Sequence, residues 1–170
     1  YNYTLWTTYA YNYNIMRKQQ YHSKELKRLI VKNKIATMIE MKVAMGTTVD
    51  ATIFRKLREL SYLRSYSHLG KYYTLPEVAR FNEQGLWSCR DVYFSKQGSL
   101  LNTIEHHVND AVAGYFEYEL ESLLHVVVRA ALLKLLKDNK IFRQKLSGRY
   151  LYCSTRIQRR KRQSSERKKQ

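Results

Sequence analysis

The fold is decided by residues 42–60, which read KVAMGTTVDATIFRKLREL. A stretch of good helix formers stops at Gly46, and a glycine just past the last helical residue commonly ends a helix. Thr47 follows at once with Asp50 three positions later, a pattern typical of a capped helix start. A helix that ends in glycine and a capped helix that begins immediately afterwards together predict the tight turn of a helix-turn-helix.

The helix after this turn is expected over residues 49–60. Its buried face should consist of apolar residues spaced by three or four, namely Val49, Ile53, Leu57 and Leu60. The outward face carries small polar groups near its start and cations further along, as a helix does when it reads DNA bases and phosphates. The expected DNA contacts on this helix are Thr48, Thr52, Arg55 and Lys56. The alternative is the solvated basic face of an ordinary helix.

Two short β-prone stretches follow, at residues 62–67 and 71–75. They flank His68, Leu69 and Gly70, a loop of hairpin length whose glycine can adopt positive φ. A helix-turn-helix followed by a hairpin is the order of elements in a winged helix. The wing is expected to direct three side chains toward phosphates, namely Arg64, His68 and Lys71. We interpret His68 as a polar loop residue and not as a catalyst.

The same pattern occurs again over residues 116–153. The matched pairs are Gly70 with Gly148, Lys71 with Arg149, and Tyr72 with Tyr150. A repeat reduces the chance that the pattern is accidental. The sequence therefore predicts a mainly α fold of the α+β class, with two winged helix-turn-helix units in tandem and small β-hairpin wings.

The third helix of the second copy, expected over residues 127–139, is apolar almost all round. Such a helix needs burial on more than one side, which favours packing against a partner or against the first unit over the reading of bases. Homodimerisation through this helix is a hypothesis. The wing of this copy is basic, so contact with the DNA backbone is still expected. The basic residues expected to touch DNA in this copy are Arg129, Arg143, Lys145 and Arg149.

The first fifteen residues differ from the rest of the chain because they carry no charge and many aromatic side chains. Met16 begins a stretch of ordinary composition. We interpret residues 1–15 as an upstream extension of the reading frame; the alternative is an aromatic, β-prone segment with an interaction role.

The remaining boundaries follow from composition and periodicity. We expect the first winged helix at 16–81, an ordered connector at 82–98, the second winged helix at 99–154 and a tail at 155–170. The connector is rich in aromatic residues, unlike a flexible linker. The tail lacks apolar periodicity and is predicted to be a disordered basic arm that contacts phosphates. The tail residues assigned to DNA are Arg159, Arg160, Lys161 and Arg162.

Charge points to a polyanionic partner. The chain of 170 residues has 31 Lys and Arg against 14 Asp and Glu, a formal net charge of +17. The excess is not confined to the tail, so the folded part is also basic. Double-stranded DNA is the leading partner and an anionic membrane surface is a weaker one. Insertion into a membrane is not expected, because no apolar run approaches the roughly 20 residues that span a bilayer.

Metal and cofactor chemistry find no support in the sequence. Cys89 and Cys153 lie far apart without metal-like spacing, and we expect ordinary thiols in a reducing setting. His106 and His107 are adjacent, and on a helix they would point about 100° apart, which does not suit one metal ion. We expect no metal, no cofactor, and a cytoplasmic, nucleoid-associated location.

Four runs resemble a group of bacterial and archaeal winged-helix proteins of uncharacterised function. They are FRKLRELSY at 54–62, SYSHLGKYYTL at 65–75, GLWS at 85–88 and GRYLY at 148–152. The resemblance covers residues 35–154 and not the chain before Met16. It implies the winged helix-turn-helix fold, DNA binding and an association with mobile elements, and it assigns no catalytic residue.

These observations predict a DNA-binding protein, either a transcriptional regulator or the DNA-recognition component of a transposition system. An enzyme is the main rival class. A metal-dependent transposase needs three spaced carboxylates on a mixed sheet, whereas the 14 acidic residues lie mostly on helical patterns, so no catalytic residues are expected. Two alternatives stay open: a protein-interaction module that uses winged helices to pack onto partners, and the DNA-binding fragment of a transposase.

Overall fold

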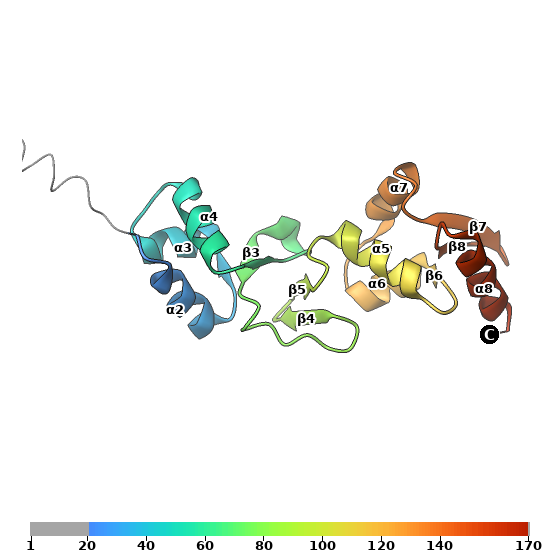
Figure 1. Ribbon diagram of the computed structural model, residues 1–170, viewed down its shortest axis with the longest axis horizontal. Helices are drawn as coiled ribbons and strands as arrows, with labels where there is room; N and C mark the ends of the chain where they lie inside the picture. Colours follow the sequence, from blue (N-terminus) through green and yellow to red (C-terminus); the bar gives the residue numbers. More distant parts are fainter. Residues whose placement is uncertain (1–20, 170) are drawn as a thin grey trace, which may run out of the picture.

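The structure of the protein is a computed structural model in which residues 21–169 are described. The predicted N-terminal segment 1–15 lies outside the described residues. Within residues 21–169 the chain has seven α-helices and small antiparallel sheets that include hairpins, which confirms the α+β part of the predicted fold class. Figure 1 shows the chain as an elongated molecule, with one group of helices at each end and a small hairpin between them.

The N-terminal group, called the first unit, packs three helices against a small sheet. Its elements are α2 (Ser23–Asn33), β1 (Ala36–Thr37), α3 (Met38–Met45), α4 (Asp50–Glu59), β2 (Leu63–Arg64), the 3-10 turn η1 (His68–Gly70) and β3 (Tyr72–Thr74). The sheet has the order β1-β3-β2 and both pairings are antiparallel. Each helix gives two buried side chains to the core: Leu26 and Ile30, Met41 and Met45, and Ile53 and Leu57.

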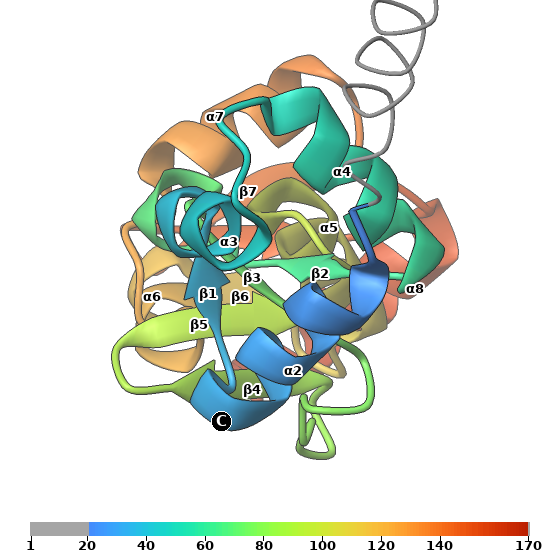
Figure 2. The same cartoon turned by 90° about the vertical axis from the view of Figure 1, so that its left-hand side faces the viewer.

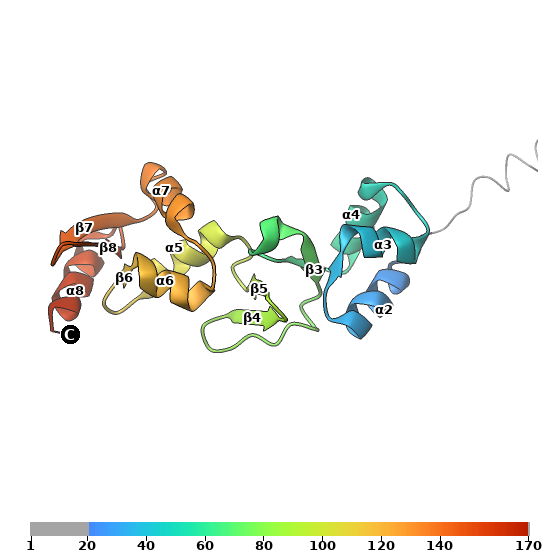
Figure 3. The ribbon, with the colours of Figure 1, turned by 180° about the vertical axis from the view of Figure 1, so that it is seen from behind.

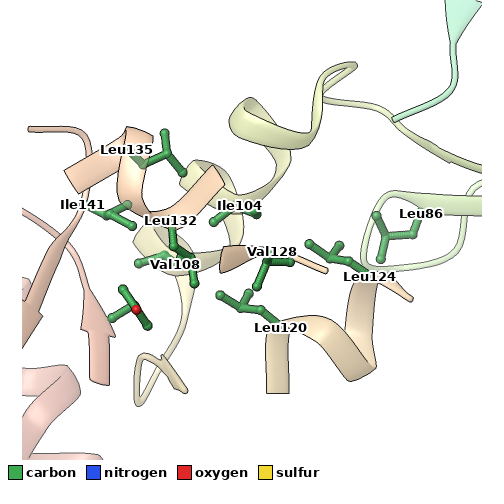
Figure 4. Close-up of a cluster of buried hydrophobic side chains, with 10 residues drawn as sticks. Leu86, Ile104, Val108, Leu120, Leu124, Val128, Leu132, Leu135 and Ile141 are labelled. Carbon is green, nitrogen blue, oxygen red and sulfur yellow. The ribbon is translucent and has the colours of Figure 1, made fainter. Parts of the chain in front are cut away.

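The second unit repeats this plan. Its elements are α5 (Leu100–Asp110), β6 (Tyr115–Phe116), α6 (Glu117–Leu124), α7 (Arg129–Lys137), β7 (Phe142–Leu146) and β8 (Arg149–Cys153). The sheet has the order β6-β8-β7, again antiparallel. Figure 4 shows its core, to which the three helices contribute Ile104 and Val108, Leu120 and Leu124, and Leu132 and Leu135.

Strand pairing corrects the register in which the two units were matched. In the first unit Tyr73 pairs with Ala36, and in the second Tyr152 pairs with Tyr115. Ala36 and Tyr115 each open the short strand that precedes the second helix, so Tyr73 corresponds to Tyr152. The predicted match of Tyr72 with Tyr150 is therefore wrong by one residue.

The mismatch of Tyr72 with Tyr150 results from the hairpin turns, which differ between the two units. The first turns through η1, whereas the second turns through only Ser147 and Gly148 between the paired residues Leu146 and Arg149. Gly70 and Gly148 therefore occupy different kinds of turn. A glycine marks a turn in a sequence but does not measure its length, which the strand pairing decides.

The connection between α3 and α4 ends one helix as predicted but starts the next differently. Gly46 has φ 63° and its N–H donates to the carbonyls of Lys42 and Val43, which confirms the glycine end of α3. The predicted cap at Thr47 is wrong, because Val49 precedes α4 and Thr47 Oγ1 only accepts from the Val49 N–H at 3.3 Å. Val49 is 54% exposed and does not belong to the core.

A capping box occurs instead at the start of α3. Thr37 Oγ1 accepts from the Glu40 N–H, and the Glu40 carboxylate accepts from the Thr37 N–H at 2.7 Å. In the second unit the Glu119 carboxylate accepts from the Phe116 N–H at 2.8 Å. Both units thus satisfy the same free N–H at the start of the second helix with a glutamate.

A hairpin of β4 (Leu86–Cys89) and β5 (Val92–Ser95) lies between the two units and contacts both. The ring of Tyr93 stacks on Tyr66 of the first unit at 6.3 Å and on His125 of the second at 5.2 Å. The Tyr66 hydroxyl donates to the Leu124 carbonyl at 3.1 Å. Burial raises the pKa of Tyr66 to about 12, so this hydroxyl keeps its proton and the bond. These contacts hold the units in one arrangement.

The last described residues form a helix, so the predicted disordered tail is wrong. α8 (Ile157–Lys168) packs against β8, as Figure 3 shows from behind the molecule. Gln163 is 1% exposed; its amide donates to the carbonyls of Val108 and Ala111 at 2.8 and 2.9 Å, and its oxygen accepts from the Ser154 N–H at 2.9 Å. A buried amide with three partners anchors a helix that has almost no apolar face.

None of the helices formed by residues 21–169 is long and apolar enough to cross a membrane.

Candidate nucleic-acid interface

The outward face of α4 carries the residues predicted to read DNA. Ile53 and Leu57 are fully buried, which turns Arg55 and Arg58 toward solvent on the opposite side. Thr48 is exposed and Thr52 half-buried. Lys56 is half-buried and its Nζ lies 2.8 Å from Glu59 Oε1, so its charge is already paired. Arg58 is therefore better placed than Lys56 to meet a polyanion.

The first hairpin brings the three predicted phosphate contacts to different environments. Arg64 Nε donates to the Gly70 carbonyl at 2.5 Å and thus folds back onto its own turn. A Cβ on Gly70 would lie 2.5 Å from that same nitrogen, so a side chain at this position would displace Arg64 from the turn. His68 is exposed and its Nδ1 lies 3.0 Å from Ser67 Oγ. Lys71 is exposed, which leaves its charge open to a ligand.

The second hairpin gathers basic residues on one face of its sheet. Lys145 pairs with Tyr150 and Arg143 with Tyr152, so all four side chains share that face. The Arg143 guanidinium lies 4.4 Å from the centre of the Tyr150 ring. Burial raises the pKa of Tyr152 and the Glu117 charge adds to the rise, while the charges of Arg143 and Arg129 act against it. Because its charge affects the pKa of Tyr152, Arg129 at the start of α7 lies near this face.

The exposed face of α7 combines cations with apolar groups. Lys134 and Lys137 hold the same positions, counted from the first residue of the helix, as Arg55 and Arg58 hold in α4, although Lys134 Nζ lies 3.1 Å from Asp138 Oδ2. Val127, just before α7, is 79% exposed, and Leu133 is 53% exposed. The helix was expected to be apolar almost all round and buried on more than one side, but within residues 21–169 it exposes a face that carries Arg129, Lys134 and Lys137. Dimerisation through it stays a hypothesis.

Two of the four cations in the predicted basic arm contact other side chains, and the other two are exposed. Arg159 lies 3.1 Å from Asp110, and the Arg160 guanidinium lies 3.9 Å from the centre of the Phe142 ring. Lys161 and Arg162 are exposed on the outer side of α8. Of the four tail residues that were expected to contact phosphates, only Lys161 and Arg162 therefore present unengaged charged groups to solvent.

The two third helices lie on one side of the molecule. Figure 1 places α4 and α7 along the upper side with α2 below, and the end-on view in Figure 2 again places both near the top. The two helices that carry these cations thus lie on the same side of the molecule. The sequence predictions for α4 and α7 include Arg55, Lys56 and Arg129 but omit Arg58, Lys134 and Lys137. Arg58 follows Arg55, and Lys137 follows Lys134, at the three-residue spacing that places two side chains on one helix face.

Metal binding finds no cluster to support it in the part of the chain that is described. Residues 21–169 contain no group of three or more His, Cys, Asp or Glu side chains placed to hold a metal ion. His106 Nδ1 lies 2.9 Å from Asp110, whereas His107 turns inward and burial lowers its pKa. The two adjacent histidines thus point into different surroundings, as expected from their spacing.

The two thiols differ in environment, which gives a labelling prediction. Cys153 is fully buried and burial raises its pKa to about 11, whereas Cys89 is partly exposed. Because the thiolate is the reactive form, iodoacetamide at neutral pH should modify Cys89 well before Cys153 in the folded protein. Mass spectrometry of the alkylated peptides checks this, with urea-unfolded protein as the control in which both react. Equal labelling in the folded state would contradict the packing of β8.

Comparison of the chain with known protein families, curated proteins and solved structures finds no match. The resemblance to bacterial and archaeal winged-helix proteins therefore stays a prediction. The functional argument depends on the residues and the geometry of this chain.

Proposed function

We propose that the protein binds double-stranded DNA through two winged helices in tandem, as a transcriptional regulator or as the DNA-recognition component of a transposition system. One observation carries the proposal. Each unit has the same succession of helix, strand, helix, helix and hairpin with the same sheet order, and its third helix exposes cations at the same positions. In a winged helix this third helix enters the major groove and the hairpin, or wing, follows the backbone.

The residues have separate roles in this proposal. Arg55 and Arg58 on α4 reach base edges or phosphates from within the groove, since arginine matches guanine in a bidentate way. Lys71 in the first wing and Arg143 and Lys145 in the second contact phosphates. Because α4 and α7 lie on one side of the molecule, a single duplex running along the long axis meets both units (Figure 1).

In this proposal the positive charge of the chain provides affinity for DNA, and helix α4 provides selectivity for a DNA sequence. The net charge of +17 attracts DNA of any sequence, and each cation that neutralises a phosphate steepens the dependence of binding on salt. Phosphate contacts carry no sequence information by themselves. A preferred sequence therefore requires side chains such as Arg55 at the groove floor.

Selection from random duplex DNA, followed by anisotropy titration on the selected site, tests the proposal. The variant Arg55→Ala/Arg58→Ala should lose the sequence preference and bind about tenfold or more weakly, because each base contact contributes roughly 1–3 kcal/mol. The matched control is Arg28→Ala/Lys32→Ala, which removes the same charge from exposed positions on α2. The control should keep the selected motif. Equal losses in both variants would mean that charge alone drives binding.

A second candidate, a protein-interaction module, is favoured by one observation. Val127, just before α7, and Leu133, in its middle, are large exposed apolar side chains. If they dock a protein, the variant Leu133→Glu will abolish that association while duplex binding by the first unit continues. Sedimentation velocity across micromolar concentrations detects the self-association form of this hypothesis, and a strictly monomeric protein would exclude it.

A further inference from the structure

Two aromatic and two arginine side chains form a stack at the end of the second unit. The Arg149 guanidinium lies 5.6 Å from the centre of the Tyr118 ring, and Tyr118 stacks on Phe116 at 5.8 Å with an angle of 12° between the rings. The Arg167 guanidinium lies 4.9 Å from the centre of the Phe116 ring. Each layer is planar, and such groups stack through cation–π attraction.

Four separate elements supply the stack, so the fold builds it. Arg149 opens β8, Phe116 ends β6, Tyr118 lies in the first turn of α6, and Arg167 lies in the last turn of α8. Phe116 is held by its pairing with Leu151 in β8. Arg167 joins the stack because α8 packs against β8.

The two ends of the stack differ in charge balance. Arg167 donates to both Glu119 oxygens at 2.8 and 2.9 Å and to the Gly114 carbonyl at 2.7 Å, so its charge is neutralised and its position fixed. Arg149 is exposed, and Tyr118 is 53% exposed. The stack is therefore anchored at its Arg167 end and open at its Arg149 end.

A hollow adjoins the stack. It has a volume of about 420 Å³ and is lined by Phe116, Leu146, Ser147, Arg149 and Arg167. Its size falls in the range of about 300–1,000 Å³ that is usual for sites of small organic groups. Two guanidinium groups and an aromatic ring line it, which suits a flat ring that carries an anionic group.

The surrounding hairpin adds unpaired positive charge. Among the ion pairs formed by residues 21–169, none involves Arg143, Lys145 or Arg149. All three are exposed. Arg149 pairs with Leu146 and therefore lies on the face of the hairpin opposite Arg143 and Lys145. Of the three, Arg149 is the cation that lines the hollow.

We propose that this surface binds single-stranded DNA, with an unpaired base added to the stack at Arg149 and a neighbouring phosphate held by the same guanidinium. A duplex hides the faces of its bases in its own stack, whereas an unpaired base can lie on an arginine or an aromatic ring. The choice of DNA as the ligand rests on the proposed function. The inference goes beyond it, because duplex recognition by α4 does not require this surface.

Fluorescence anisotropy with labelled oligothymidylate of about 15 nucleotides, near the upper site size of one binding domain, tests the inference on the full chain. Arg149→Lys keeps the charge but removes the planar group, and Tyr118→Leu removes an exposed ring. Each should weaken binding by about tenfold, in line with the loss of one base stack. Two controls should bind as the unchanged protein does: Tyr118→Phe, which keeps the ring, and Arg162→Lys, which makes the same exchange at an exposed position on α8.

The outcomes separate this inference from the proposed function. Unchanged binding of oligothymidylate by both Arg149→Lys and Tyr118→Leu would overturn it, since charge alone would then suffice. An equal loss of duplex binding in the same variants would also overturn it, because the surface would then serve duplex DNA. If α4 does not bind DNA, the Arg55→Ala/Arg58→Ala variant will bind the duplex as the unchanged protein does. That result would leave the affinities of the Arg149 and Tyr118 variants for oligothymidylate unaffected. Circular dichroism melts confirm that each variant is folded.

Discussion

Replacing Gln163 with leucine is expected to lower the free energy of unfolding by about 3 kcal/mol or more, since each buried polar group left without a partner costs roughly 1–3 kcal/mol. The substitution removes the partners of the Val108 and Ala111 carbonyls and of the Ser154 N–H at once. Leucine fills a similar volume, so the loss reflects hydrogen bonding and not a cavity. We also expect α8 to detach from β8, because little apolar surface holds it there.

Urea unfolding followed by circular dichroism measures this effect, and hydrogen exchange of the α8 amides reports detachment. The matched control is Gln158→Leu, which makes the same exchange at an exposed position of the same helix and should change stability by less than about 0.5 kcal/mol. If the two variants unfold alike, the buried amide does not anchor α8.

Replacing Gly114 with alanine is expected to lower the free energy of unfolding by about 3 kcal/mol, from strain of roughly 1–2 kcal/mol at positive φ together with overpacking of about 1–3 kcal/mol. Gly114 has φ +67°, and a Cβ there would lie 2.8 Å from the Tyr152 carbonyl oxygen and 3.1 Å from Cys153 Sγ. The carbonyl belongs to the middle of the sheet and cannot move without breaking strand pairing.

Gly148→Ala supplies the control for this prediction. Gly148 has φ +82°, but a Cβ there would meet nothing within 4 Å, so only the strain of roughly 1–2 kcal/mol remains. Thermal melts of the two variants should therefore differ clearly, with Gly114→Ala the less stable. Similar melting temperatures would show that the β6–β8 edge adjusts to the extra atom at little cost.

Local signals determined the helices and hairpins that the sequence predicted correctly. Gly46 ends α3 because a glycine adopts the left-handed conformation without strain, whatever surrounds it. The apolar spacing of Ile53 and Leu57 is enough to orient α4, since no other face of that helix can be buried. These features depend on neighbours within a few residues, so they can be predicted from the amino-acid sequence alone.

The same local rules failed at the start of α4. Thr47 and Asp50 have the spacing of a capping box, but the box takes Glu or Gln at its last position, which Glu40 supplies after Thr37 at the start of α3. The Asp50 carboxylate instead pairs with Lys42 across the turn. Spacing alone therefore predicted a cap that does not form.

By itself, the sequence determined the class of the fold, the existence of a repeat and the cations from which an interface could be built, because periodicity and charge are local properties. The tertiary structure alone decided the register of the repeat, through the pairing of β1 with β3 and β6 with β8. It also decided the fate of the basic C-terminal residues, since α8 is held by Gln163 and Arg167 through partners some fifty positions earlier in the chain. Contacts between distant residues cannot be read from composition, and they determine which charges stay free for a ligand.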